Sequence, residues 1–249
     1  PEMRVFARRS SVARGRSARR AHADDLDDKV RGCTVSVAIS RLVLGPLLNN
    51  VYLLGDEDSK DAVVIDPSFE PQRQAAEIRR RGWRLRQIWL THGHFDHIEG
   101  VAALQALFEP APLLGMHPAA EAWARTYGQK ANFGFAVSAL PPVDIQFFGG
   151  QRLAVTPESG TFFAEVRETP GHSPGSVIFY CPDLQAAFVG DAIFRGSIGR
   201  TDLAGGDYPT LISAIRTQIF TLPDDTVLFP GHGPESSVGY EKANNPFLL

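Results

Sequence analysis

Short apolar runs bounded by glycine, proline or polar turns dominate the hydrophobic pattern of this chain. Such runs, rich in β-branched residues, predict strands. We expect strands at residues 34–44, 49–54, 62–65, 85–90, 112–115, 143–148, 153–155, 163–167, 177–181, 186–189 and 227–229. Apolar positions three and four apart predict helices. We expect helices at residues 72–81, 98–108, about 117–127 and 210–220, and a loop at 131–142.

The order of these elements predicts the fold class. Repeated strands, followed by alternating helices and strands, occur in two halves, and no linker separates the halves. Strands and helices in this order favour an α/β layered fold in which two β-sheets pack face to face with helices outside. We therefore expect one domain over residues 31–249.

Composition is that of an ordinary soluble globular protein. Of the 249 residues, 43% are hydrophobic and 21% are charged. No apolar run approaches the ~20 residues that span a bilayer, so we expect no membrane partner. Cys33 and Cys181 lie far apart. They predict no disulfide framework, which fits a reducing compartment.

Charge is unevenly placed along the chain. Residues 1–22 hold seven arginines and one acid, whereas the whole chain carries −3. The remaining residues are therefore acidic, which argues against nucleic acid as a partner. The first segment is rich in Arg, Ser and Ala and nearly free of acids, as organelle transit peptides are. We expect residues 1–30 to be disordered, with a mitochondrial or plastid address. Without a targeting role the segment would be a plain tail on a cytoplasmic protein.

The strongest chemical signal is the sequence Thr-His-Gly-His-Phe-Asp-His at residues 91–97, directly after a predicted strand. In an extended loop His92 and His94 point the same way, so their imidazoles can share one metal ion. Asp96 and His97 belong to the next turn and suit a second ion nearby. Four polar side chains crowded beside a buried strand would be costly without a metal.

Three further ligand types follow strands at glycine-containing turns: His172, Asp191 and His232. His22 and His117 lie elsewhere, and we expect neither to be a ligand. Five histidines and two aspartates suit two divalent ions of borderline hardness, namely zinc, iron or manganese. Two ions roughly 3.5–4 Å apart can share a water and ionise it near neutral pH.

At these residues the chain resembles the metallo-β-lactamase superfamily, whose fold is an αββα sandwich of two mixed sheets. Within it, the sequence is similar to the glyoxalase II group of hydroxyacylglutathione hydrolases, in the short bacterial-type form. The resemblance covers about residues 34–247. Besides the ligand loops, it rests on residues 190–194 (Gly-Asp-Ala-Ile-Phe), 196–202 (Gly-Ser-Ile-Gly-Arg-Thr-Asp), 230–234 (Pro-Gly-His-Gly-Pro) and 244–247 (Asn-Asn-Pro-Phe).

The resemblance implies a ligand set and a reaction. The first metal would be held by His92, His94 and His172. The second would be held by Asp96, His97 and His232, with Asp191 bridging the two. The expected reaction is hydrolysis of a small thioester, S-lactoylglutathione or a related acyl-glutathione, by a bridging hydroxide.

Further roles follow from the same resemblance. Asp96 would also steer the proton of the nucleophile, and Arg195 and Arg200 would bind the anionic glutathione. We expect a monomer or a homodimer. Longer glyoxalase II enzymes bind glutathione through a C-terminal helical extension, whereas only 17 residues follow His232 here. Thioester hydrolysis is therefore expected, and the identity of the thiol is open.

Two alternatives share these residues. A related branch, the persulfide dioxygenases, uses a single iron held by the equivalents of His92, His172 and Asp191. A non-catalytic metal-binding scaffold is the alternative from another class, although such a protein would be expected to lack a ligand. A β-lactamase fits less well, because residues 199–202 and the C-terminal segments match the glyoxalase side better.

Overall fold

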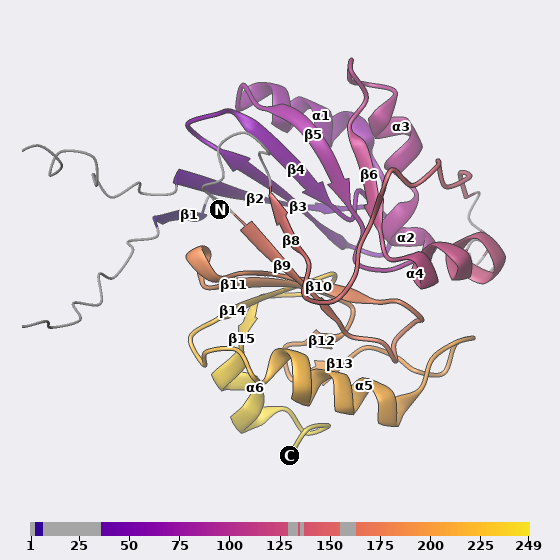
Figure 1. Ribbon diagram of the computed structural model, residues 1–249, viewed down its shortest axis with the longest axis vertical. Helices are drawn as coiled ribbons and strands as arrows, with labels where there is room; N and C mark the ends of the chain where they lie inside the picture. Colours follow the sequence, from indigo (N-terminus) through magenta and orange to yellow (C-terminus); the bar gives the residue numbers. More distant parts are fainter. Residues whose placement is uncertain (1–2, 7–35, 129–133, 135–136, 155–162) are drawn as a thin grey trace, which may run out of the picture.

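The structure is a computed structural model that describes residues 3–6, 36–128, 134, 137–154 and 163–249. Two β-sheets lie face to face, and helices cover their outer faces (Figure 1). This arrangement confirms the predicted layered α/β class. It satisfies the rule that each sheet must bury its apolar faces against another layer.

The first sheet has seven strands in the order β1-β2-β3-β4-β5-β6-β7. Its strands are β1 (Met3–Phe6), β2 (Ser36–Leu44), β3 (Asn49–Asp56), β4 (Asp61–Ile65), β5 (Arg84–Trp89), β6 (Leu113–Met116) and β7 (Ile145–Gln146). Strands β1 to β4 pair antiparallel, with Ile39 opposite Leu54, whereas β4 to β7 pair parallel. The carboxyl ends of β4 and β5 therefore meet at one edge.

The second sheet has six strands in the order β15-β14-β11-β10-β9-β8. Its strands are β8 (Arg152–Ala154), β9 (Phe163–Glu168), β10 (Val177–Cys181), β11 (Ala186–Gly190), β14 (Val227–Pro230) and β15 (Ser236–Ser237). Only β11 and β14 pair parallel, so their carboxyl ends also share an edge. A small hairpin of β12 (Ile193–Phe194) and β13 (Ser197–Ile198) follows β11.

Helices pack on the outer face of each sheet. The first sheet is covered by α1 (Pro71–Arg80), α2 (Phe95–Ile98), α3 (Val101–Gln105) and α4 (Pro118–Trp123). The second is covered by α5 (Tyr208–Ala214) and α6 (Val238–Asn244). Short π-helical turns continue α4 to Gly128 and α5 to Ile219, and a 3-10 turn spans Pro182–Leu184. None of the helices in the described part of the chain has the length and apolar character needed to traverse a bilayer.

The interior between the sheets explains why the central strands are apolar throughout. On β10, Val177 and Phe179 face the first sheet, while Ile178 faces the outer layer that includes α5. Trp89 of the first sheet meets Phe179 with their ring centroids 5.2 Å apart. A strand buried on both faces needs apolar residues at every position instead of every second one.

Several elements differ from the sequence-based expectations. The strand expected at 143–148 is reduced to β7, and α6, β12, β13 and β15 were not expected. Residues Met3–Phe6 pair with the edge of β2, although residues 1–30 were expected to be disordered. An open strand edge offers unpaired N–H and C=O groups, which an N-terminal segment can satisfy. Residues 7–35 lie outside the described residues, so the organelle address stays a prediction.

The helix expected at 98–108 is two helices, α2 and α3, that meet at Gly100. The Gly100 amide donates to the Pro67 carbonyl at 2.9 Å. A Cβ on Gly100 would lie 1.8 Å from the Ser68 carbonyl oxygen. The loop after β4 therefore passes through the space that a side chain would occupy, and this contact was not visible in the local sequence.

Gly100→Ala is accordingly expected to destabilise the protein, by about 1–3 kcal/mol in chemical unfolding. Its backbone has φ −78° and ψ −9°, where alanine is ordinarily favoured over glycine by about 0.5–1 kcal/mol. Gly149→Ala is the control, because the three atoms nearest to its Cβ would all belong to the flexible Glu168 side chain, the closest at 3.2 Å. Equal stability of the two variants would contradict the close approach at Gly100.

Candidate metal centre

All seven residues expected to ligate metal converge on one edge of the sandwich. His92 and His94 follow β5, and Asp96 and His97 lie on α2. The other three sit in loops of the second sheet: His172 between β9 and β10, Asp191 after β11 and His232 after β14. The two sheets are joined here by a hydrogen bond from the Val177 amide to the Thr91 carbonyl, 2.8 Å long.

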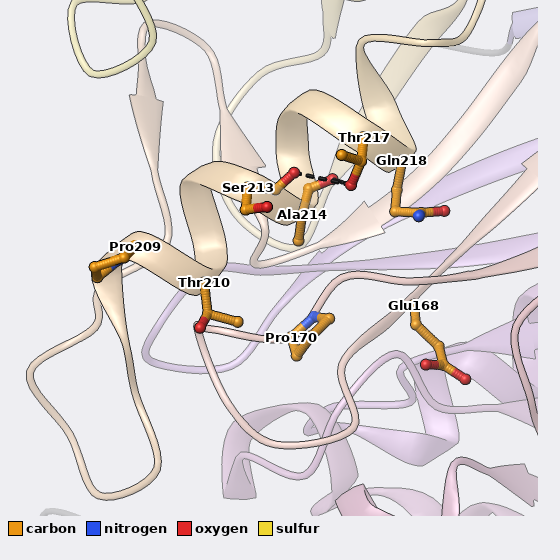
Figure 2. Close-up of a pocket in the computed structure, with 8 residues that line it drawn as sticks. All are labelled: Glu168, Pro170, Pro209, Thr210, Ser213, Ala214, Thr217 and Gln218. Carbon is orange, nitrogen blue, oxygen red and sulfur yellow. Dashed lines mark hydrogen bonds between the residues drawn. The ribbon is translucent and has the colours of Figure 1, made fainter.

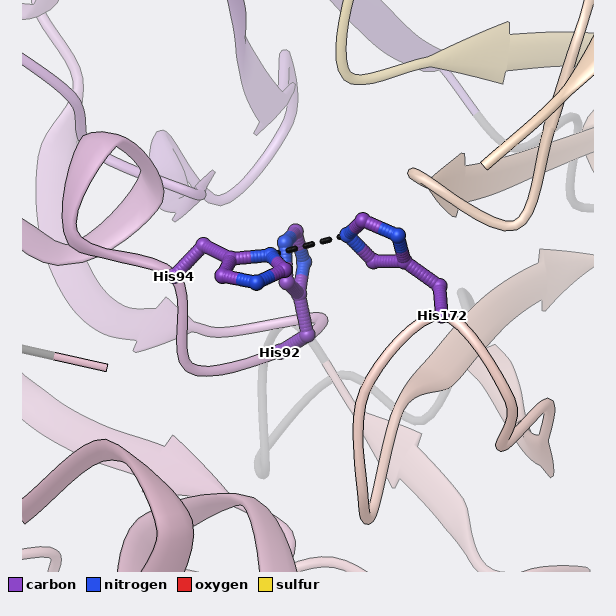
Figure 3. Close-up of side chains that lie close together, drawn as sticks. All are labelled: His92, His94 and His172. Carbon is purple, nitrogen blue, oxygen red and sulfur yellow. Dashed lines mark hydrogen bonds between the residues drawn. The ribbon is translucent and has the colours of Figure 1, made fainter. Parts of the chain in front are cut away.

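The first cluster consists of His92, His94 and His172, whose ligand atoms lie within 4.8 Å of one another. Figure 3 shows the three rings turned toward one another, with Nδ1 of His94 2.8 Å from Nε2 of His172. Burial lowers the pKa of all three rings, that of His94 to about 3. Neutral imidazoles keep a nitrogen lone pair, which is the form that binds metal.

The second cluster consists of Asp96, His97 and His232. Oδ2 of Asp96 lies 3.5 Å from Nε2 of His97 and 3.3 Å from Nε2 of His232. Burial opposes ionisation of Asp96, but the neighbouring His97 and a hydrogen bond with His232 lower its pKa to about 2. Asp96 in this cluster is therefore ionised, whereas the first cluster consists of imidazoles alone.

Asp191 lies between the two clusters. Its Oδ1 is 3.5 Å from Nε2 of His97, and its Oδ2 is 3.7 Å from Nε2 of His172 and 3.6 Å from Nε2 of His232. Its carboxylate thus faces ligands of both clusters. This is the position that the family resemblance implied for Asp191 as a bridging ligand.

Asp66 is a buried part of the site that sequence reasoning missed. It forms a third group with His92 and His97, but its oxygens already accept hydrogen bonds. Oδ1 accepts from the Thr91 amide, and Oδ2 accepts from the Thr91 hydroxyl at 2.6 Å and from Nδ1 of His97 at 3.0 Å. Thr91 in turn contacts Nδ1 of His92 at 2.9 Å. Asp66 therefore orients two histidines from behind, as outer carboxylates do at metal sites.

The other histidines are oriented in the same way. Nδ1 of His172 donates to the Arg200 carbonyl at 2.8 Å, and Nδ1 of His232 donates to the Leu47 carbonyl at 3.0 Å. In both rings Nε2 faces the other proposed ligands. Asn49, also missed from the sequence, donates to Oδ2 of Asp96 at 2.8 Å. Only its position could have identified Asp66 from the sequence, because Asp66 directly follows β4, which runs parallel to β5.

Asp66→Asn is expected to weaken metal binding by about 10–100-fold, the usual effect of losing an outer partner of a ligand. The Asp66 carboxylate accepts the Thr91 amide at one oxygen and the Thr91 hydroxyl and His97 at the other. An asparagine side chain has a single acceptor oxygen, so it loses the hydrogen bonds made at one of these two atoms. Competition with a chromophoric chelator measures the change. Asp61→Asn is the matched control, because Asp61 is equally buried on β4 but pairs with Arg84 and Arg86. Wild-type metal affinity in Asp66→Asn would contradict the orienting role.

The chemistry of the side chains fits divalent cations. Nε2 of His92, Nε2 of His94 and Oδ1 of Asp191 are buried without a hydrogen-bond partner. Unsatisfied buried groups of this kind require an explanation. Cations at the two clusters would satisfy Nε2 of His92, whose Nδ1 faces Thr91, and Oδ1 of Asp191, which faces His97. For His94 the nitrogen that faces the first cluster is Nδ1. Imidazole and carboxylate ligands together suit zinc, iron and manganese.

A cavity of about 300 Å³ opens onto both clusters. It is lined by Leu47, His94, Phe95, Asp96, His172, Asp191, Arg200, Leu203 and His232. Arg200 is thus at the cavity. Arg195 is not among its lining residues: its guanidinium lies over the Tyr240 ring, 4.6 Å from the centroid. His117, expected not to ligate, caps α4 by accepting the Ala119 amide, and His22 lies outside the described residues.

A second cavity of about 490 Å³ lies between α5 and the segment after β9 (Figure 2). Its lining consists of Glu168, Pro170, Pro209, Thr210, Ser213, Ala214, Thr217 and Gln218. Glu168 is the one ionisable side chain in that set. The cavity of about 300 Å³ is therefore the one whose lining includes the proposed metal ligands.

Comparison with known proteins agrees with this geometry. The family model described as "Metallo-beta-lactamase superfamily" matches residues 44–232. The chain is 37% identical over 211 residues to the hydroxyacylglutathione hydrolase GloC of Haemophilus influenzae, covering 80% of this chain and 92% of that protein. It is 35% identical over 202 residues to the human mitochondrial persulfide dioxygenase ETHE1, covering 79% and 70%.

Solved structures give the same result. The structure of BLEG-1 B3 metallo-beta-lactamase superposes with a TM-score of 0.77 and 36% identity, covering 85% of this chain and 99% of that one. The structure of TTHA1623 in a di-iron-bound form superposes with a TM-score of 0.72 and 37% identity, covering 84% and 100%. The matched family model and the extent of these similarities show that the chain belongs to the metallo-beta-lactamase superfamily.

Proposed function

We propose that this protein is a metal-dependent thioester hydrolase of the glyoxalase II kind. Its substrate would be S-lactoylglutathione or a related acyl-glutathione, cleaved to a hydroxy acid and a thiol. The observation that carries the proposal is the pair of ligand clusters on the two sides of Asp191. The similarity to a relative named as a hydroxyacylglutathione hydrolase supports it.

Each ligand has a proposed place. His92, His94 and His172 would hold one cation, Asp96, His97 and His232 a second, and Asp191 would contact both. Bound divalent cations supply a water nucleophile that is ionised near neutral pH and polarise the substrate carbonyl. Zinc, iron and manganese all suit these ligands, and the di-iron form of one similar structure supports iron as a candidate.

Asp96 has a second proposed role, because it both belongs to a cluster and lines the cavity. Its low pKa keeps the carboxylate ionised, and Asn49 holds one of its oxygens. A fixed, ionised carboxylate accepts a hydrogen bond from the attacking water and directs its lone pair. The leaving thiolate, with a thiol pKa of about 8.5, needs little protonation at neutral pH. No separate acid is therefore required.

Arg200 would bind the anionic part of the thiol. It lines the cavity and forms a forked pair with Asp202, with both N–O distances 2.8 Å. The pair is exposed, with 51% and 67% of the two side chains accessible, so an incoming carboxylate can compete for the guanidinium at small cost. Leu47 and Leu203 give the same cavity an apolar rim. Arg195 would meet only parts of a substrate that extend beyond the cavity.

Persulfide oxidation is the second candidate, because relatives named as persulfide dioxygenases are 35% identical to this chain. That reaction was expected to need one iron on His92, His172 and Asp191. The second cluster favours the hydrolase, because Asp96, His97 and His232 lie close enough together to hold the second cation that the hydrolysis proposal uses. The same complete set argues against a non-catalytic scaffold.

Loss of the thioester absorbance of S-lactoylglutathione tests the proposal, with the full chain and added Zn²⁺, Fe²⁺ or Mn²⁺. Oxygen uptake with glutathione persulfide is measured in parallel on the same preparation. We expect metal-dependent thioester cleavage and no oxygen uptake. Oxygen uptake without thioester cleavage would overturn the proposal in favour of the dioxygenase, and inactivity in both assays would favour the scaffold.

A further inference from the structure

The segment from Gly199 to Gly206, called the cavity loop below, carries Arg200 and Leu203 to the cavity. Two side chains from elsewhere hold it by its carbonyl groups. Nδ1 of His172 donates to the Arg200 carbonyl at 2.8 Å, and the Trp123 indole N–H donates to the Ala204 carbonyl at 3.0 Å. One of these donors is a proposed metal ligand, and the other packs on one.

Trp123 lies on α4 and is 7% exposed. Its ring meets the His94 ring edge to face, with centroids 5.0 Å apart and an interplanar angle of 87°. The buried indole therefore packs directly against the ring of a proposed ligand of the first cluster. Because the rings cross at nearly a right angle, movement of the indole would remove a contact that limits rotation of His94.

The space on both sides of the indole is closed. Gly93 lies in the segment 91–94 after β5, which we call the metal loop. A Cβ on Gly93 would lie 2.9 Å from the Ala120 carbonyl oxygen of α4 and 3.2 Å from the Trp123 ring. A Cβ on Gly205, inside the cavity loop, would lie 2.9 Å from the indole nitrogen, and Gly205 has φ +85°. Both glycines permit the two loops to approach one aromatic ring. The indole is thus packed between the metal loop and the cavity loop.

We propose that Trp123 is a positioning residue that couples the first metal cluster to the cavity loop, an inference that rests on the proposed metal centre and substrate cavity. The ring holds His94 in its ligating orientation. The indole N–H holds Ala204, and through it the position of Arg200 and Leu203. A cation on His94 and His172 fixes both donors of the cavity loop, so metal binding orders the residues that contact the substrate.

Hydrogen–deuterium exchange on the full chain, with metal and after chelation, tests the coupling. The amides of Gly206 and Asp207 are the reporters, because they donate to the carbonyls of Leu203 and Gly171. In the wild type we expect metal to slow their exchange. Trp123→Phe keeps a ring and removes the N–H. It should speed their exchange in the metal-loaded protein by about three- to tenfold, the effect of one lost hydrogen bond on a local opening.

Kinetics and a matched control separate this role from a structural one. Trp123→Phe should raise KM for the thioester while kcat stays within about twofold, because the lost contact places the substrate loop and not the metal. Its metal content should match the wild type. Trp89→Phe is the control: it also loses one indole hydrogen bond, to Gln87 at 2.8 Å, but in the core. It should leave the exchange of Gly206 and Asp207 unchanged.

A third variant tests the role of the ring. Trp123→Leu removes the aromatic ring that packs against His94. It should weaken metal affinity by about tenfold, as loss of an outer contact of a ligand does. Unchanged loop exchange and KM in Trp123→Phe, or unchanged metal affinity in Trp123→Leu, would overturn the coupling. If the wild type itself binds no metal, the proposed metal centre fails instead, so the two failures are distinguishable.

Discussion

Asp191→Asn is expected to lower kcat/KM for the thioester by about a thousandfold, corresponding to the several kcal/mol that metal-assisted charge stabilisation contributes. Asp191 is the carboxylate whose oxygens face both clusters, at 3.5 Å from His97 and 3.7 Å from His172. An amide offers one neutral oxygen, so it cannot serve two cations. Steady-state kinetics at saturating metal measures the change.

The control is Asp224→Asn, which removes a carboxylate that pairs with Lys242 and is 72% exposed. It should keep wild-type kinetics, because exposed ion pairs contribute little. Circular dichroism and elemental analysis of both variants show whether the fold and the metal content survive. Near-normal turnover in Asp191→Asn would refute a bridging role for this carboxylate.

Chelation is expected to abolish turnover and to lower the unfolding temperature by roughly 10 °C. A ligand present at 100 to 1,000 times its Kd stabilises a protein by about 3–4 kcal/mol, and each kcal/mol is worth about 2–4 °C at this chain length. We expect this stabilisation because of the side chains that form the proposed metal centre. Without cations, Nε2 of His92, Nε2 of His94 and Oδ1 of Asp191 are buried without a hydrogen-bond partner.

Thermal unfolding of the full chain, with EDTA and with zinc-saturated EDTA, measures this effect. The saturated chelator is the control for any direct action of EDTA on the protein. Asp191→Asn should show a smaller chelator-induced shift than the wild type, because it binds its cations more weakly. Equal unfolding temperatures of the wild type in all conditions would mean that no tightly held metal stabilises the fold.

The ligand set could be predicted because each segment that carries ligands comes after a strand. Strand ends are visible in the hydrophobic pattern, and parallel neighbours bring their carboxyl ends to one edge. His92 follows β5 by this rule, and Asp191 and His232 follow the parallel pair β11 and β14. The structure brings all seven residues together, as their spacing and the family resemblance implied.

The outer partners of the ligands could not be predicted in the same way. Asp66 meets His97 across 31 positions, and Asn49 meets Asp96 across 47. Neither residue belongs to a local motif, and an aspartate before a proline is ordinarily a turn residue. Only the parallel pairing of β4 with β5 would have placed Asp66 beside the metal loop.

Helix α6 shows a further limit. It has buried residues at Val238 and Glu241 but no apolar stripe. The buried Glu241 carboxylate accepts the Gly196 amide at 3.1 Å and the Asn245 side chain at 2.7 Å. A helix anchored by a buried polar cluster carries no hydrophobic periodicity, so a search for apolar spacing does not find it.

Elemental analysis of the full chain, purified and loaded with excess divalent metal and then desalted, tests the dinuclear centre most directly. We expect two metal equivalents per chain, falling to one in His232→Ala, which removes a ligand of the second cluster, and also to one in His94→Ala, which removes a ligand of the first. A single equivalent in the wild type, retained in His232→Ala and lost in His94→Ala, would contradict the dinuclear hydrolase and identify a one-metal enzyme.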